Sequence, residues 1–241
     1  MFNESINYLR KSDELYKTVF IGGILTLLGF LLVPTFTVVG YVVRVLRRTS
    51  RGDEEPPVFT DVDDAIEMTV EGFKGFVVAF VYSLVPLVVA GVLVGGSIVS
   101  LIAGGGGNSG GLVGLGLGGL LLGGLVALVL GLAAAYVIPA ALANFADAGS
   151  IGAGFDFDVL RPVLTSSTYA RGWLVGLAVV IVGGILLSVL SIVPLLGTVL
   201  GVFVQFYFLV AAYYVIGRTW GELRDVAPVG DGDSPSEQAA V

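Results

Sequence analysis

The stretch GFVVAFVYSLVPLVVAGVLVGGSIVSLIAGGGGNSGGLVGLGLGGLLLGGLVALVLGLAAAYVIPAALANFA occupies residues 75–146 and contains no Lys, Arg, Asp or Glu in 72 residues. A water-soluble domain has too few polar groups here to cover such a length, whereas a bilayer accommodates it. Two more uncharged stretches, 18–43 and 172–217, repeat the pattern. The chain is therefore expected to be an integral membrane protein.

The polar remainder of the chain is acidic. The net charge is −7, and lysine occurs only at positions 11, 17 and 74. An acid-rich, lysine-poor surface is typical of proteins that work in concentrated salt, so a halophilic source is expected. The same charge argues against nucleic acid as a partner, because phosphates repel such a surface.

The composition narrows the chemistry that is available. The chain has no cysteine and no histidine, which removes disulfides, thiolate nucleophiles, imidazole bases and the commonest soft metal sites. No catalytic residue, metal site or cofactor is predicted. An enzyme would have to use carboxylates, hydroxyl groups and arginine alone.

Breaks in the uncharged stretches predict four membrane spans. A span needs about 20 apolar residues, and residues 103–111, AGGGGNSGG, are too polar and flexible for a lipid-exposed helix. They divide the longest stretch into spans near 73–102 and 112–140. A tight turn at Pro194 divides the last stretch into spans near 173–193 and 195–217.

The first stretch, residues 19–46, leaves two alternatives. It crosses the membrane once, which places nine cations inside and three outside, or it turns back at Pro34 as two half-helices, which places all twelve inside. The positive-inside rule slightly favours the re-entrant form, with both termini in the cytoplasm. An extra crossing made by a turn at Pro86 is rejected, because it leaves the cations from Arg44 to Lys74 outside.

The organisation that follows has three parts. Residues 1–17 are expected to form an amphipathic helix on the membrane surface, with Phe2, Ile6 and Leu9 on one face and Arg10, Lys11 and Lys17 near headgroups. Residues 18–224 form the membrane domain, and 225–241 form a disordered acidic tail. The sequence SLVPL at 83–87 recurs as SIVPL at 191–195, which predicts an internal duplication with halves near 18–102 and 112–220.

Several short motifs together resemble one family. The chain is similar to archaeal, mainly haloarchaeal, membrane proteins grouped as domain of unknown function 4013, over about residues 5–224. The motifs are IGGIL at 21–25, LLVP at 31–34, GYVVR at 40–44, PPVF at 56–59, EGFKGF at 71–76, IPAALANF at 138–145 and GRTW at 217–220. The resemblance implies a helical membrane fold and carries no known activity.

Glycines spaced by four residues are interpreted as helix contacts. The segment GLGLGG at 114–119 fits a dinucleotide fingerprint by letter, but it opens an apolar helix without the strand that this site requires. Small residues four apart let helix backbones approach closely in lipid. The pairs are Gly91 and Gly95, Gly114 and Gly118, Gly119 and Gly123, Gly172 and Gly176, and Gly197 and Gly201.

A few polar side chains are candidates for function. Asn144, Asp147, Asp156, Asp158 and Arg161 follow a span and could form a polar cluster for a cation or a headgroup. The favoured alternative is a solvated loop in which Asp147 or Asp158 pairs with Arg161 or Arg171.

Gln205 is the amide placed deepest in a predicted span. In hydrocarbon it needs a partner. Ser188, Thr198 or a backbone carbonyl is the favoured one, and a role in a substrate path is the alternative.

These observations predict an all-helical bundle of five to six membrane-embedded helices. The leading hypothesis for function is a non-enzymatic membrane scaffold or partner-binding module, with lipid and a membrane protein or a second copy as partners. The alternative is a permease for a small polar molecule or lipid that uses the interface between the repeats. A polar cavity that reaches Gln205 favours the permease, and a dry centre packed by glycines favours the scaffold.

Overall fold

A computed structural model describes residues 2–11, 14–28, 32–104, 110–193 and 196–226, and the acidic tail from 227 lies outside these residues. Every regular element in this part of the chain is helical. In chain order the elements are α1 Phe2–Tyr8, η1 Leu9–Lys11, α2 Leu15–Leu27, α3 Leu32–Ser50, α4 Val62–Gly104, α5 Gly110–Ala148, η2 Ile151–Phe155, α6 Phe157–Leu164, α7 Ser167–Leu190 and α8 Leu196–Val226.

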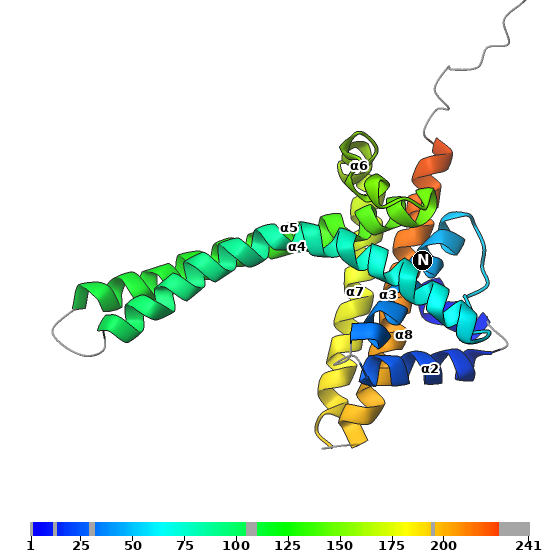
Figure 1. The fold of residues 1–241 in the computed structure, drawn as a ribbon, viewed down its shortest axis with the longest axis horizontal. Coiled ribbons are helices and arrows are strands. Elements are labelled where there is room, and N and C mark those ends of the chain that lie inside the picture. Colours follow the sequence, from blue (N-terminus) through cyan, green and yellow to red (C-terminus); the bar gives the residue numbers. More distant parts are fainter. Residues whose placement is uncertain (1, 12–13, 29–31, 105–109, 194–195, 227–241) are drawn as a thin grey trace, which may run out of the picture.

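The four predicted spans are confirmed as α4, α5, α7 and α8, which are long and apolar enough to cross a membrane. They form two hairpins, α4 with α5 and α7 with α8. Figure 1 shows that the α4–α5 hairpin extends far from the other helices, while α7 and α8 run in a different direction. Most of the glycine-rich break at 103–111 and the turn residue Pro194 lie outside the described residues.

Helices α4 and α5 are both longer than the spans predicted for them. Helix α4 has 43 residues and therefore measures about 65 Å, twice the thickness of the apolar layer. Its start is capped by Asp61, whose Oδ1 accepts a hydrogen bond from the backbone N of Asp64 at 2.8 Å. Helix α5 continues to Ala148 and stops at Gly149, whose φ of 72° ends a helix readily.

Residues 19–46 form two helices, α2 and α3. Helix α2 has 13 residues, about 20 Å, which is too short to cross a bilayer of about 30 Å. Nζ of Lys11, before α2, lies 2.7 Å from Oε2 of Glu54, after α3. The two ends of the helix pair therefore lie close together, as in a hairpin, and the re-entrant position of this pair in the membrane stays a prediction.

The break in this hairpin does not coincide with Pro34. Helix α2 ends at Leu27 and α3 begins at Leu32, so Pro34 lies in the first turn of α3. A proline fits there, because the amide that it lacks has no partner in the first turn of a helix. Pro86 and Pro139 likewise lie inside the continuous helices α4 and α5. The internal duplication stays a prediction, since Pro194 is not described.

The N-terminal segment, residues 2–11, packs against other helices of the protein. Tyr8 and Leu9 are only 0% and 1% exposed, and the Tyr8 ring lies 4.4 Å from that of Tyr214 on α8. The single amphipathic helix expected for residues 1–17 is divided into α1 and η1, which pack on α8, and the start of α2 at Leu15. Its place at the membrane surface stays a prediction. Phe2 remains exposed on its outer side.

The largest core lies where the helices converge. Val43 and Leu46 of α3, Phe145 of α5 and Trp220 of α8 are buried together. We call this region, made of residues 40–74, 140–171 and 210–226, the base of the molecule. Both apolar hairpins project from the base, and the charged side chains described below lie on it.

Candidate functional site at the base

A network of charged side chains joins α3 to α4. Arg44 and Arg47 lie three residues apart on α3, and Asp64, Glu67 and Glu71 lie three and four apart on α4. These spacings place each set on one face of its helix. The side chains that face each other carry opposite charges, so α3 and α4 attract each other at this point.

Glu71 is at the centre of this Arg44 network. Its Oε2 accepts from Nε of Arg44 at 3.0 Å, and its Oε1 accepts from Nη1 of Arg47 at 2.8 Å. Arg44 also pairs with Asp64. The Arg44 and Glu71 side chains are only 16% and 18% exposed, so water screens this pair less than a surface pair.

Two glycines let α3 and α4 come close enough for the network. A Cβ on Gly72 would lie 1.7 Å from the carbonyl oxygen of Phe36, and one on Gly40 would lie 1.8 Å from that of Met68. The two backbones are therefore in direct contact. Arg47 extends the connection to α5, because its Nε donates to the carbonyl oxygen of Ala146 at 2.9 Å.

A second ion pair, between Lys11 and Glu54, connects the N-terminal segment to the base. Its hydrogen bond lowers the pKa of Glu54 and raises the pKa of Lys11. Nearby, the hydroxyl of Tyr8 donates to the carbonyl oxygen of Glu55 at 3.3 Å. These contacts connect residues before α2 with the loop after α3.

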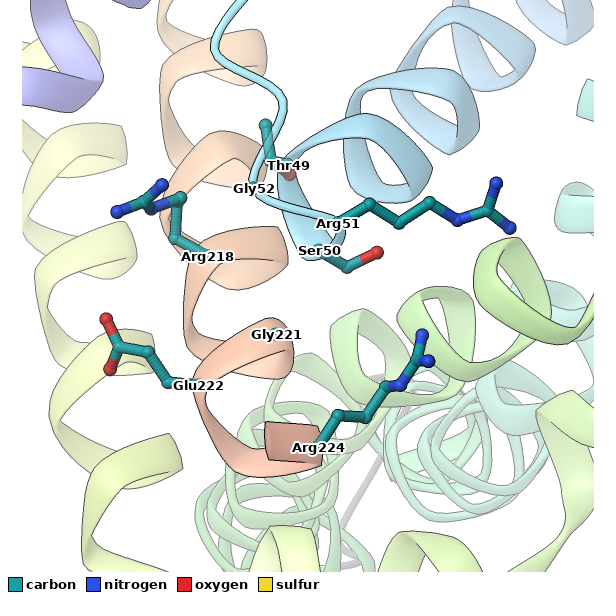
Figure 2. A pocket seen from close by; sticks show the side chains of 8 residues that line it. All are labelled: Thr49, Ser50, Arg51, Gly52, Arg218, Gly221, Glu222 and Arg224. Carbon is teal, nitrogen blue, oxygen red and sulfur yellow. The ribbon is translucent and has the colours of Figure 1, made fainter. Parts of the chain in front are cut away.

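An open pocket lies beside the end of α8 (Figure 2). Its volume is about 250 Å³, and it is lined by Thr49, Ser50, Arg51, Gly52, Arg218, Gly221, Glu222 and Arg224. We call it the arginine pocket. Arg224 pairs with Asp147 of α5. Among the described residues Arg51 and Arg218 form no ion pair.

The predicted polar cluster after α5 is divided among separate structural roles. The Asn144 amide is buried and donates to the carbonyl oxygen of Ala153 at 2.7 Å, which holds η2. Asp147 pairs with Arg224, whereas Arg161 and Arg171 were the partners expected. Asp156 caps α6 by accepting from the backbone N of Asp158 at 3.1 Å.

The rest of that cluster stays at the surface. Asp158 and Arg161 are exposed on α6. Over the described residues, no three acidic side chains gather in a way that could hold a metal ion. The five residues are therefore not brought together as one site.

Gln205 faces outward from α8. Its side chain is exposed and borders an open groove of about 200 Å³, lined mainly by apolar residues of α7 and α8. The hydroxyl of Ser188 donates to the carbonyl oxygen of Gly184 at 2.9 Å. Nothing is described for the Thr198 side chain, and no hydrogen bond to Gln205 occurs among the described residues.

The glycine pairs differ in what surrounds them. A Cβ on Gly119 would lie 2.3 Å from Oγ of Ser97, and one on Gly123 would lie 2.9 Å from Cβ of Leu93. Close neighbours also surround Gly172, Gly197 and Gly201, and Gly176 has a backbone oxygen at 3.5 Å. Gly91, Gly95, Gly114 and Gly118 have nothing within 4 Å of such an atom.

Sequence reasoning missed the Arg44 network and the arginine pocket. From the sequence, the acids at 64, 67 and 71 had no role beyond the net charge, although their helical spacing is visible there. Arg51 and Arg218 are far apart in the sequence and had no signal that joined them. The arrangement at the base can hold helices together and can attract an anion.

Long apolar helices in two hairpins, with a charged base at one end, define a multi-pass helical membrane protein. The chain matches the family described as protein of unknown function (DUF4013) over residues 27–192. This is more than half of its length, and the chain belongs to that family. No curated protein and no solved structure matches it.

Proposed function

We propose that this protein is a non-enzymatic membrane scaffold whose base holds two apolar hairpins for contact with partner membrane segments. The observation that carries the proposal is the exposure of the α4–α5 hairpin. In the most apolar part of α4 and of α5, only 6% of residues are buried inside the chain, against 44% in α8. A surface of this length is available to lipid or to another protein.

The glycines of the hairpin support a protein partner. Gly91 and Gly95 on α4 and Gly114 and Gly118 on α5 form small-residue pairs that no other part of the described chain fills. In lipid, helices associate through such flat surfaces because backbones can approach closely. A second copy or another membrane protein is the partner class that fits.

The orientation belongs to the same proposal. The base carries Arg44, Arg47, Arg48 and Arg51 as well as Arg218 and Arg224. By the positive-inside rule this side faces the cytoplasm. The N-terminal segment is fastened to the base by Lys11 and Glu54, so both termini are assigned to the cytoplasm, and the acidic composition supports a haloarchaeal source.

The permease is the second candidate. Its support is the break between α2 and α3, since discontinuous helices line the substrate sites of many transporters. The groove beside Gln205 supports it less, because this groove opens on the outer surface of α7 and α8 and has mostly apolar walls. The scaffold is therefore preferred.

Substitution of Gly118 tests the proposal. A Cβ there would have no other atom of the described chain within 4 Å, so a leucine has open space to enter and the purified protein should keep its thermal stability in detergent. The same variant should fail to restore growth under osmotic stress in a strain that lacks the gene, because it blocks the partner surface. Gly123→Leu is the matched control, and it should lower thermal stability because Leu93 lies against that position.

Gln205→Leu separates the two candidates. A scaffold should tolerate this change, and the strain should grow as it does with the native chain. A folded Gln205→Leu protein that fails to support growth, together with full growth for Gly118→Leu, would favour the permease. Full growth with both variants would exclude this face of the hairpin as a partner surface.

A further inference from the structure

The arginine pocket is a concentration of positive charge on an acidic protein. The chain has a net charge of −7, yet the described side chains that line the pocket include three arginines and one carboxylate, Glu222. Asp147 neutralises only Arg224. From this imbalance and the geometry described next, we propose that the pocket binds a phosphate group.

Two segments distant in sequence build the pocket. Arg51 follows α3 in a turn that ends at Gly52, whose φ is 79°, a value that favours glycine. Arg218 and Arg224 lie on the last three turns of α8. A Cβ on Gly221 would lie 2.5 Å from the carbonyl oxygen of Ser50, so this glycine allows the end of α3 to rest on α8.

Figure 2 shows how the side chains are arranged around this contact. Arg51 and Arg224 extend to the same side of α8, and the Ser50 hydroxyl lies between them. Arg218 and Glu222 extend to the opposite side. One Nη of Arg224 is used by Asp147, which fixes the guanidinium and leaves its other N–H groups to donate.

Guanidinium groups favour phosphate as the ligand. Each presents a planar pair of donors that matches two phosphate oxygens, and such charged hydrogen bonds are among the strongest in proteins. The volume of about 250 Å³ suits a phosphate or a small headgroup and is below the usual range for larger ligands. A single anion there would neutralise Arg51, which has no ion pair among the described residues.

The position of the pocket along α8 indicates that it lies near the membrane surface. Arg218 is the first charged residue after the uncharged stretch 172–217. Basic side chains placed directly beyond a span meet anionic lipid headgroups. The phosphate therefore has two sources, a lipid headgroup or free inorganic phosphate, and both present the same chemistry to the arginines.

The test uses the full chain in neutral detergent. Phosphatidylglycerol and phosphatidylcholine are titrated separately and bound lipid is counted by native mass spectrometry, while inorganic phosphate is titrated by thermal shift. We expect one anionic probe to bind and Arg51→Gln to weaken its binding about tenfold, which corresponds to the loss of about one charged hydrogen bond. Arg161→Gln changes the net charge equally at an exposed position outside the pocket, and it should bind as the native chain does.

The two sources give different results. Binding of phosphatidylglycerol but not of inorganic phosphate assigns the site to a lipid headgroup, and the reverse assigns it to free phosphate. If neither probe binds, or if both variants bind equally well, the proposal is overturned.

Arg51→Lys is a second variant that keeps the proposal testable if Arg51→Gln does not fold. Lysine keeps the charge but cannot bridge two oxygens, so we expect a several-fold loss of affinity with native circular dichroism. Native affinity in this variant would also overturn the proposal.

Discussion

Replacing Gly72 by alanine should weaken the base more than its single methyl group suggests. The new Cβ would lie 1.7 Å from the carbonyl oxygen of Phe36 and 2.5 Å from the backbone N of Gly40. Carbon and oxygen ordinarily approach to about 3.3 Å, so α3 and α4 must separate by roughly 1.5 Å. Glu71 precedes Gly72, and this shift would take its 2.8 and 3.0 Å contacts with the two arginines beyond hydrogen-bonding distance.

The magnitude follows from these two effects. Overpacking of this kind costs about 1–3 kcal/mol, and weakening of the partly buried ion pairs adds about 1 kcal/mol. The better helix propensity of alanine returns up to about 1 kcal/mol. We therefore expect a net loss of about 2 kcal/mol in the free energy of unfolding.

Gly91→Ala is the matched control for this prediction. It adds the same methyl group to the same helix where nothing lies within 4 Å, and it should be neutral or slightly stabilising. Both variants are unfolded in detergent and followed by circular dichroism, with the fluorescence of buried Trp220 as a second probe. Equal stability of Gly72→Ala and Gly91→Ala would refute the close contact between α3 and α4.

Two more predictions concern the charges of the base. Glu71→Gln should lower the free energy of unfolding by about 2 kcal/mol, because it leaves partly buried arginines without their carboxylate. The control is Glu67→Gln, at a side chain that is 72% exposed, and it should change this free energy by at most about 0.5 kcal/mol. Similar losses for the two variants in thermal unfolding would contradict the network. The lowered pKa of Glu54 and the raised pKa of Lys11 mean that their contact contributes fully above the ordinary pKa of a carboxyl group and below that of lysine. The contribution should disappear as the pH falls through the lowered folded pKa of Glu54, so amide exchange in residues 2–11, corrected for its intrinsic rate, should accelerate in acid, and Glu54→Gln should remove this dependence.

The membrane spans could be predicted because they depend on an absence of charge. Stretches such as 75–146 have no stable place in water, whatever their neighbours are. A turn back within residues 19–46 was also within reach, since the count of cations favoured it. The position of the break between α2 and α3 could not be predicted, because Pro34 is compatible with the first turn of a helix as well as with a turn between helices.

The contacts between helices were harder to predict. Gly118 and Gly123 have similar local sequences, yet only Gly123 meets another helix. The spacing of small residues shows which face of a helix can pack closely, but it does not show which helix packs there. Gln205 shows the same difficulty, because its depth in α8 was evident and the direction in which it points was not.

The unbroken path of α4 has a mechanical consequence. One continuous helix runs from Asp64, in the charged base, to Gly104, near the tip of the hairpin. Gly104 lies 32 residues beyond Gly72, about 48 Å along the helix. A rotation of only about 5° where α4 crosses α3 would therefore displace this end by about 4 Å. The contact of Gly40 and Gly72 thus acts as a pivot, at which a small electrostatic change in the charged base becomes a larger movement at the far end of the hairpin.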